Sequence, residues 1–273
     1  MFTQQDFPTW LELEQYVRTL QAATSKPEDS TPGFHSPLLY RGQASHGWSL
    51  ETTLHRSAPT LTGLSDYYRL AAVAKTQVES FTSRNWPTID YVEAEELLSR
   101  YDTLRNGPLP HYEYLVYLRH HGFPSPLLDW SRSLYVAAFF AFQKPQAEQV
   151  AIFVYQEFAG FGKASSSGQA QIHTLGPNIR THQRHFLQQA EYTTALHFRD
   201  GAWRLANHMD VFLGGREEQD HLWKLTAPAA EARLVMQELE QFNINAFSLF
   251  QTEDALLATI ASRLISHGPY GAP

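Results

Sequence analysis

The sequence predicts an α+β protein with a single domain, in which N-terminal helices precede a mixed or antiparallel sheet. Segments with helical spacing of apolar residues cluster before residue 120, whereas runs rich in β-branched and aromatic residues are concentrated after it. The chain has 273 residues, 43% of them hydrophobic, which is enough for one sizeable core. Helices first and strands later favour an α+β architecture over alternating βαβ units.

The first half of the chain is expected to be mainly helical. Thr9 can cap a first helix that runs to residue 23, and Ser65 or Asp66 can cap a second one over residues 64–85. Further helical patterns cover residues 92–101 and 108–118. Residues 25–36 collect Pro, Ser, Thr, Gly and acidic side chains and are therefore expected to form a loop.

Residues 37–43, PLLYRGQ, predict a short buried strand that delivers Arg41 to an edge or a cleft. Gly42 would let a backbone or a ligand approach closely. An arginine after a strand is more often a surface or salt-bridge residue, so its position alone does not make Arg41 functional.

The second half is expected to supply most of the sheet. Residues 150–155, VAIFVY, are the clearest candidate for a buried strand. Further strands are expected at residues 194–198, 221–225 and 244–250, with helices at 229–241 and 254–265. Residues 160–171 are expected to form a Gly/Ser-rich loop, and residues 208–219 a polar insertion.

The stretch over residues 120–142, HHGFPSPLLDWSRSLYVAAFFAF, places polar side chains directly before an apolar helix that starts near Ser133. The first turn of such a helix offers hydroxyl groups and free backbone N–H groups, which suit an anionic ligand. The alternative is structural: Asp129, Ser131 or Ser133 caps the helix, and Trp130 fills the core.

Composition excludes several classes of site. A formal net charge of −7 argues against broad electrostatic binding to nucleic acid or to an anionic membrane. The absence of cysteine excludes disulfides, thiolate zinc sites and a cysteine nucleophile. No basic region precedes an apolar run at the N-terminus and no stretch has the length of a membrane span, so a cytoplasmic protein without a membrane partner is expected.

The thirteen histidines do not form a recognisable metal motif, because no His-Glu-x-x-His or similar spacing is present, and no metal is expected. Phosphate-loop, dinucleotide-binding and nucleophile-elbow motifs are absent as well. The candidate site therefore consists of three separate segments, residues 40–43, 121–133 and 184–193, which a fold would have to bring together.

Several ordered motifs in these segments resemble the FRG domain family, which is named for its Phe/Tyr-Arg-Gly motif. The first motif is Tyr40-Arg41-Gly42-Gln43, followed by Trp48, Leu50, Leu54 and Arg56. Next come residues 121–131, HGFPSPLLDWS, and the apolar core of residues 136–141. The match continues through Arg184, Gln188, Tyr192-Thr193 and 248–250. The resemblance implies an N-terminal helix and loop over residues 1–36, an FRG domain over 37–266 and a tail over 267–273.

The chain departs from the family pattern at a few positions. The family usually has Thr where this chain has Ser125 and Ser131, Gly where it has Ala190, and Pro where it has Gln251. None of these differences removes a reacting group.

The order of an arginine on a first strand, a Ser-bearing element and then Gln189-Ala190-Glu191 is also similar to ADP-ribosyltransferases. That similarity implies their fold, NAD as substrate, and cleavage of the nicotinamide–ribose bond by transfer or hydrolysis, as in bacterial toxins and phage-defence effectors. Arg41 would hold the NAD phosphates or ribose, Ser131 or Ser133 would support the nicotinamide ribose, and Glu191 would stabilise the transition state.

The same similarity makes Gln189 a group that positions the acceptor, a protein or a nucleic acid, and leaves Asp129 or Glu191 as the key acidic residue. The side chains expected to contact the substrate are Tyr40, Gln43, His121, Trp130, Ser133, Arg184 and Gln188. A structural alternative for Gln189 and Glu191 is the solvated face of a helix.

Two other classes of function remain open from the sequence. One is a non-catalytic module that binds nucleotide or RNA ends through Arg41, Arg56, His121 and Arg132 around an aromatic-lined cleft. The other is a metal-dependent nuclease that uses His120, His121 and Asp129.

Overall fold

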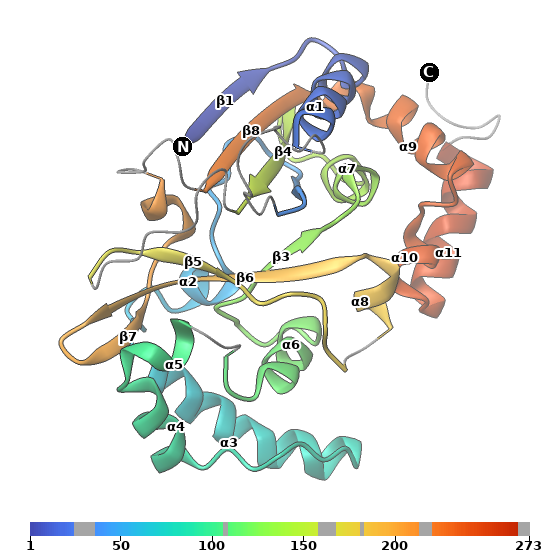
Figure 1. Ribbon diagram of the computed structural model, residues 1–273. Coiled ribbons are helices and arrows are strands. Elements are labelled where there is room, and N and C mark those ends of the chain that lie inside the picture. The colour runs from blue at the N-terminus through green and yellow to red at the C-terminus, as the bar shows by residue number, and fades with distance from the viewer. Residues whose placement is uncertain (25–35, 106–108, 158–167, 181–182, 213–219, 267–273) are drawn as a thin grey trace.

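The computed structural model describes residues 1–24, 36–105, 109–157, 168–180, 183–212 and 220–266. They form a mixed eight-stranded sheet with helices on both sides (Figure 1). The strands are β1 (Phe2–Asp6), β2 (Leu39–Gln43), β3 (Leu128–Ser131), β4 (Gln149–Gln156), β5 (Gln171–Thr174), β6 (Ala190–Arg199), β7 (Ala202–Leu205) and β8 (His221–Pro228). The helices are α1 (Trp10–Thr24), α2 (Thr53–Ser57), α3 (Leu64–Thr82), α4 (Tyr91–Leu98), α5 (Tyr101–Arg105), α6 (Tyr112–His120), α7 (Leu134–Phe142), α8 (Arg184–Leu187), α9 (Ala232–Gln241), α10 (Ala246–Phe250) and α11 (Glu253–Ala261).

The sheet has the order β1-β8-β4-β2-β3-β6-β5, with β7 paired to β6. All pairs are antiparallel except β1–β8, which is parallel. Strands β2 and β4 share five residue pairs, but β2 and β3 share only one, Tyr40 with Ser131. The sheet is therefore split at this point into one half with β1, β8, β4 and β2 and another with β3, β6, β5 and β7.

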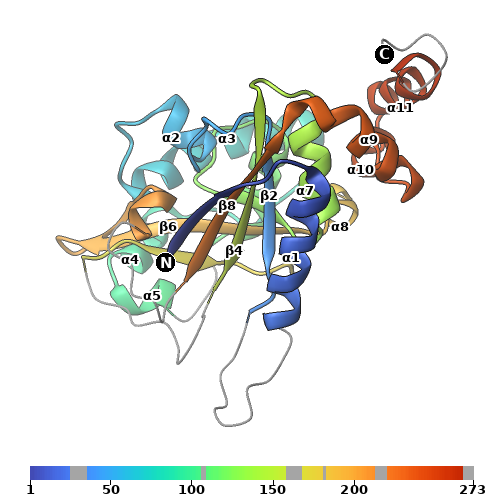
Figure 2. The same ribbon diagram turned by 90° about the horizontal axis from the view of Figure 1, so that it is seen from above.

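Each half of the sheet is covered by its own helices. Alternate residues of β4 and β8, including Ile152, Val154 and Leu225, pack against α1, α7 and α9. On the other half, Tyr192 and Leu196 of β6 pack against α3, α4 and α6. Figure 2 shows α1 and α7 beside β2 and β4, with the α9–α11 group extending away from the sheet.

A third apolar core joins the two halves of the sheet. It contains Leu39, Phe153 and Tyr155 from one half, and Leu128, Trp130 and other residues from the other half. Because side chains alternate along a strand, one face of each half turns toward this shared core and the opposite face turns toward helices. The two halves are thus held together by packing rather than by continuous strand pairing.

Most of the predicted elements are confirmed. Thr9 accepts a hydrogen bond from the Glu12 backbone N–H at 3.2 Å at the start of α1, and the strands at 37–43, 150–155 and 221–225 are β2, β4 and part of β8. The α+β class with a mixed sheet is likewise confirmed. Strands β1, β3, β5 and β7 and helix α2 were not predicted from the sequence.

Two local predictions are wrong. Residues 244–250 do not form a strand but contain α10, because Asn245 and Ser248 form a reciprocal capping box. The α3 helix begins after Gly63 without a side-chain cap, so neither Ser65 nor Asp66 caps it. Most of the loop expected at 25–36, much of 160–171 and 208–219, and the tail at 267–273 lie outside the described residues.

Candidate functional site

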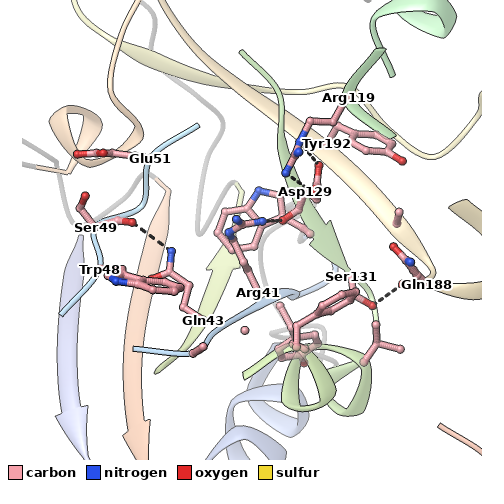
Figure 3. Close-up of a pocket in the computed structure, with 18 of the residues that line it drawn as sticks. Arg41, Gln43, Trp48, Ser49, Glu51, Arg119, Asp129, Ser131, Gln188 and Tyr192 are labelled. Carbon is pink, nitrogen blue, oxygen red and sulfur yellow. Dashed lines mark hydrogen bonds and ion pairs between the residues drawn. The ribbon is translucent and has the colours of Figure 1, made fainter. Parts of the chain in front are cut away.

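A pocket of about 700 Å³ opens where the sheet splits between β2 and β3 (Figure 3). Its walls come from β2, the segment that follows it, the end of α6, β3, α7 and the start of β6. The lining residues that matter here are Arg41, Gln43, Trp48, Glu51, Arg56, Arg119, His120, Asp129, Trp130, Ser131, Gln188 and Tyr192. The volume lies within the usual range of small-molecule sites.

Gly42 explains how α7 comes to form one wall of this pocket. A Cβ at Gly42 would lie 1.8 Å from the Ala137 backbone oxygen and 2.8 Å from the Ala141 backbone nitrogen. Only glycine therefore lets α7 pack directly on β2, and the close approach expected at Gly42 is that of a backbone. This packing places the start of α7 beside Arg41.

Arg41 lies between the two ends of the pocket (Figure 3). Its Nη1 donates a hydrogen bond to the Asp129 backbone oxygen at 2.8 Å, and its buried Nε has no partner within the described residues. Burial, with smaller contributions from Arg119 and Arg56, lowers the pKa of Arg41 to about 10, although Asp129 acts in the opposite direction. The guanidinium thus stays charged at neutral pH.

Asp129 points toward the same pocket from β3 and is held by Arg119 of α6. The Arg119 Nε donates to Oδ1 at 3.0 Å and Nη2 donates to Oδ2 at 2.6 Å, a bidentate ion pair that fixes the plane of the carboxylate. Three guanidinium groups line the pocket, Arg41, Arg56 and Arg119, against the two carboxylates of Asp129 and Glu51. The pocket therefore carries an excess of positive charge, which suits an anionic ligand.

Ser131 and Ser133 connect β3 to α7. The Ser131 hydroxyl donates to the Gln188 backbone oxygen at 2.7 Å and accepts from the Ser133 N–H at 3.0 Å, while the Ser133 side chain caps α7 by accepting from Val136 N–H at 3.3 Å. Ser131 and Gln188 line the pocket, whereas Ser133 serves as the helix cap. The Gln188 amide in turn donates to the Leu249 backbone oxygen at 3.1 Å.

Trp130 is 2% exposed and belongs both to the pocket wall and to the shared core. Its indole N–H donates to the Thr193 hydroxyl at 2.8 Å, and that hydroxyl lies 2.9 Å from Nε2 of the buried His208. Because the indole can only donate, the Thr193 hydroxyl accepts this bond, and its direction of bonding with His208 follows the tautomer of the imidazole. Trp130 therefore both fills the core and lines the pocket, the two positions that the sequence left open for it.

Gln189 and Glu191 lie outside this pocket. Glu191 stands opposite Trp130 in the β3–β6 ladder, on the face away from Asp129, Ser131 and Tyr192. Its carboxylate is buried and paired with Arg132, and it lies on a strand rather than on a solvated helix face. Gln189 is exposed, has a left-handed backbone with φ of 47°, and lines a separate cavity with Arg132 and His185.

The remaining predicted contacts divide between the pocket and its surroundings. Tyr40 lines the pocket, and its hydroxyl accepts from the Gln21 amide at 2.8 Å. His121 ends α6 with its ring 4.3 Å from that of Tyr117, and Arg184 stacks over Phe250 at 5.5 Å; neither lines the pocket. Ala190, where the family has Gly, is extended at the start of β6, so its Cβ is accommodated.

Several lining residues were not named as substrate contacts from the sequence. Arg119 reaches the pocket only because α6 ends beside β3, and no local pattern indicates this. Trp48 and Tyr192 belong to the motifs that resemble the FRG family, and Glu51 follows Trp48 closely, so these motifs are the sequence feature that could have suggested them.

Within the described ranges, no group of three or more His, Asp or Glu side chains is arranged to hold a metal ion. In the same ranges, no helix combines the length and apolarity needed to cross a bilayer.

A comparison with protein families matches one part of this chain. Residues 36–150, fewer than half of the 273, match the FRG domain family. Over this stretch the chain is similar to an FRG domain. The matched region includes most of the pocket wall, namely β2, the segment that follows it, the end of α6, β3 and α7, and it ends before Gln188 and Tyr192. No curated protein and no solved structure matches the chain.

Proposed function

We propose that this protein binds NAD, or a closely related nucleotide, in the split-sheet pocket and cleaves the bond between nicotinamide and ribose. The observation that carries the proposal is Arg41: a charged guanidinium with a buried unpartnered Nε, beside the fixed carboxylate of Asp129, in a pocket of ligand size.

In this proposal, the Arg41 guanidinium binds the NAD phosphates. Its only hydrogen bond within the described residues goes to a neutral backbone oxygen, so its charge is not neutralised by a direct ion pair there. A planar guanidinium can donate two parallel hydrogen bonds to phosphate oxygens. Arg56 lines the same pocket and adds to the attraction for an anion.

Asp129 is the carboxylate that acts on the reacting ribose. When the glycosidic bond breaks, its electron pair leaves with nicotinamide, which becomes neutral, and positive charge develops on the ribose. A carboxylate held in place by Arg119 stabilises this charge without reorganising in the transition state. Attack by water then gives ADP-ribose and a proton, whereas attack by an acceptor group gives the ADP-ribosylated product and releases that group's proton.

The choice of Asp129 over Glu191 follows from their surroundings. Asp129 lines the pocket with 38% of its side chain exposed, whereas the Glu191 side chain is 5% exposed and faces Arg132 outside it. A buried ion pair of this kind also has a purely structural explanation.

One observation favours a second function, a non-catalytic nucleotide-binding module. Both oxygens of Asp129 already accept hydrogen bonds from Arg119, which reduces the charge that the carboxylate offers to a substrate. For the nuclease alternative no comparable observation exists, since Asp129 is engaged by Arg119 and the Nε2 of His120 lies 2.6 Å from the Tyr192 hydroxyl.

The test is nicotinamide release from NAD, measured by chromatography beside ligand-induced thermal stabilisation. We expect release by the wild type, and loss of release in Arg41→Ala and Asp129→Asn with the variants still folded. Asp66→Asn makes the same chemical change at an exposed site outside the pocket and should retain activity. Stabilisation by NAD without nicotinamide release would favour the binding module. The absence of both stabilisation and release would refute the proposal.

A further inference from the structure

The pocket has two chemically different ends. Asp129, Arg119 and Tyr192 lie at one end, Trp48, Gln43 and Glu51 lie at the other, and Arg41 lies between them (Figure 3). NAD likewise has two ring systems joined by a pyrophosphate. If the phosphates are bound at Arg41, the two rings must extend toward opposite ends of the pocket.

Trp48 is the first observation that points to a ligand at the second end. It is 50% exposed, whereas each of the other five tryptophans in the chain is buried or only partly exposed. A large aromatic ring left in solvent at the wall of a pocket is typical of a binding surface. Aromatic side chains of this kind stack on nucleobases.

Gln43 is the second and independent observation. It is 6% exposed, lines the pocket, and donates through Nε2 to the Ser49 backbone oxygen at 3.1 Å. Because a carbonyl can only accept, this bond fixes which way the amide points. The other amide atom, Oε1, is then a buried acceptor that has no partner within the described residues and could accept from an amino group.

We propose that Trp48 and Gln43 form an adenine subsite, with Trp48 stacking on the base and Gln43 Oε1 accepting from its exocyclic amino group. This inference rests on the proposed function. The direction of the dinucleotide follows from Asp129, since the ribose whose bond breaks must lie beside that carboxylate. Adenine is therefore placed at Trp48 and nicotinamide near Tyr192.

The experiment titrates two half-ligands, AMP and nicotinamide mononucleotide, into the wild type and Trp48 variants by calorimetry. We expect Trp48→Ala to weaken AMP binding roughly tenfold or more and to leave nicotinamide mononucleotide binding unchanged, because the ring on which the base stacks is lost. Trp48→Phe keeps a stacking face and should retain most of the AMP affinity. Phe81→Ala removes another exposed ring, 91% exposed on α3 and outside the pocket, and should change neither ligand.

A second measurement tests Gln43 by changing the ligand instead of the protein. Nicotinamide hypoxanthine dinucleotide carries an oxygen in place of the exocyclic amino group and would set two acceptors against each other. We expect the wild type to bind it at least about tenfold more weakly than NAD, because the buried Gln43 Oε1 would be left unpaired.

The outcomes separate this inference from the proposed function. If Trp48→Ala weakens only nicotinamide mononucleotide, the dinucleotide lies in the opposite direction and the subsite is wrong. If both ligands bind all variants equally well, or if the hypoxanthine analogue binds as well as NAD, the subsite is also wrong while the nucleotide site stands. If the wild type binds neither half-ligand nor NAD, the proposed function fails with it.

Discussion

Trp130 links the stability of the protein to its pocket. It packs in the core that joins the two halves of the sheet, and its indole N–H is bonded to Thr193. Truncation of a buried Trp costs about 3–5 kcal/mol, so Trp130→Ala should fold poorly. Trp130→Phe keeps most of the apolar volume and should be folded, with moderately weaker ligand binding because the Thr193 hydrogen bond is lost. Chemical denaturation of both variants checks this, and a Trp130→Ala variant as stable as wild type would remove Trp130 from the core.

Because of His208, the free energy of unfolding is expected to decrease at acid pH. Burial, and secondly the charge of Arg41, lower its pKa to about 3 from an ordinary value of 6.5. The unfolded chain therefore takes up a proton below pH 6.5 that the folded chain refuses until about pH 3. The stabilisation that neutral His208 contributes is fully present above pH 6.5. It is lost as the pH falls from 6.5 to about 3, and the loss reaches up to about 5 kcal/mol because each pH unit corresponds to about 1.4 kcal/mol.

The free energy of unfolding between pH 4 and pH 7 tests this effect. His208→Gln keeps a hydrogen-bonding group for Thr193 but cannot titrate, so its stability should fall less steeply with acid than that of the wild type. His55→Gln, at an exposed position on α2, should keep the steep wild-type dependence. Equal slopes for wild type and His208→Gln would show that His208 does not carry the effect.

At the scale of single residues, the sequence identified Arg41, Asp129 and Trp130 as candidates, and all three line the pocket. It could not separate Asp129 from Glu191. Asp129 lies on β3 and Glu191 on β6, and which faces of the paired strands they occupy depends on the register between β3 and β6, a tertiary property. The bidentate partner of Asp129, Arg119, was missed because it stands at the end of α6, where charged residues are common.

At the scale of elements, the contact between β2 and α7 determines the shape of the pocket. A Cβ at Gly42 would meet backbone atoms of α7, which cannot rotate away as a flexible side chain could. Gly42→Ala should therefore push α7 from β2 and destabilise the protein by several kcal/mol, roughly the range of strongly overpacked cores. Thermal unfolding measures the loss.

Gly47 provides the matched control for this substitution. A Cβ there would meet only the Ser45 Oγ at 3.5 Å, an ordinary contact. Gly47→Ala should leave the free energy of unfolding within about 1 kcal/mol of wild type, the scale of a Gly-to-Ala backbone effect. Similar stabilities for Gly42→Ala and Gly47→Ala would contradict the account of the β2–α7 contact.

Elements with strong local patterns were predictable, such as α1, α3, β4 and α9. Apart from β2, most short elements were not, since a few residues carry little periodic information. Residues 244–250 show the limit: apolar residues recur along them as in a strand, but the Asn245–Ser248 capping box, satisfied from within the segment, selects a helix. Strands β5 and β7 are four residues long, and their pairing with β6 defines them more than their composition does.

At the scale of the whole molecule, the split between β2 and β3 is what creates the pocket. The α+β class followed from the order of helical and strand-like segments, but the split did not. It depends on which strands become neighbours, and β2 and β3 are separated by more than eighty residues of mostly helical chain. The sequence could therefore predict three site segments without predicting that they meet between two halves of a sheet.

The most direct test of the pocket as a nucleotide site is calorimetric titration of NAD into wild type and Arg41→Lys. Lysine keeps the positive charge but cannot form the two parallel hydrogen bonds of a guanidinium, so Arg41→Lys should bind NAD at least about tenfold more weakly and nearly as poorly as Arg41→Ala. Arg132→Lys makes the same change outside the pocket and should bind as the wild type does. Equal affinity of wild type and Arg41→Lys for NAD would contradict the central claim.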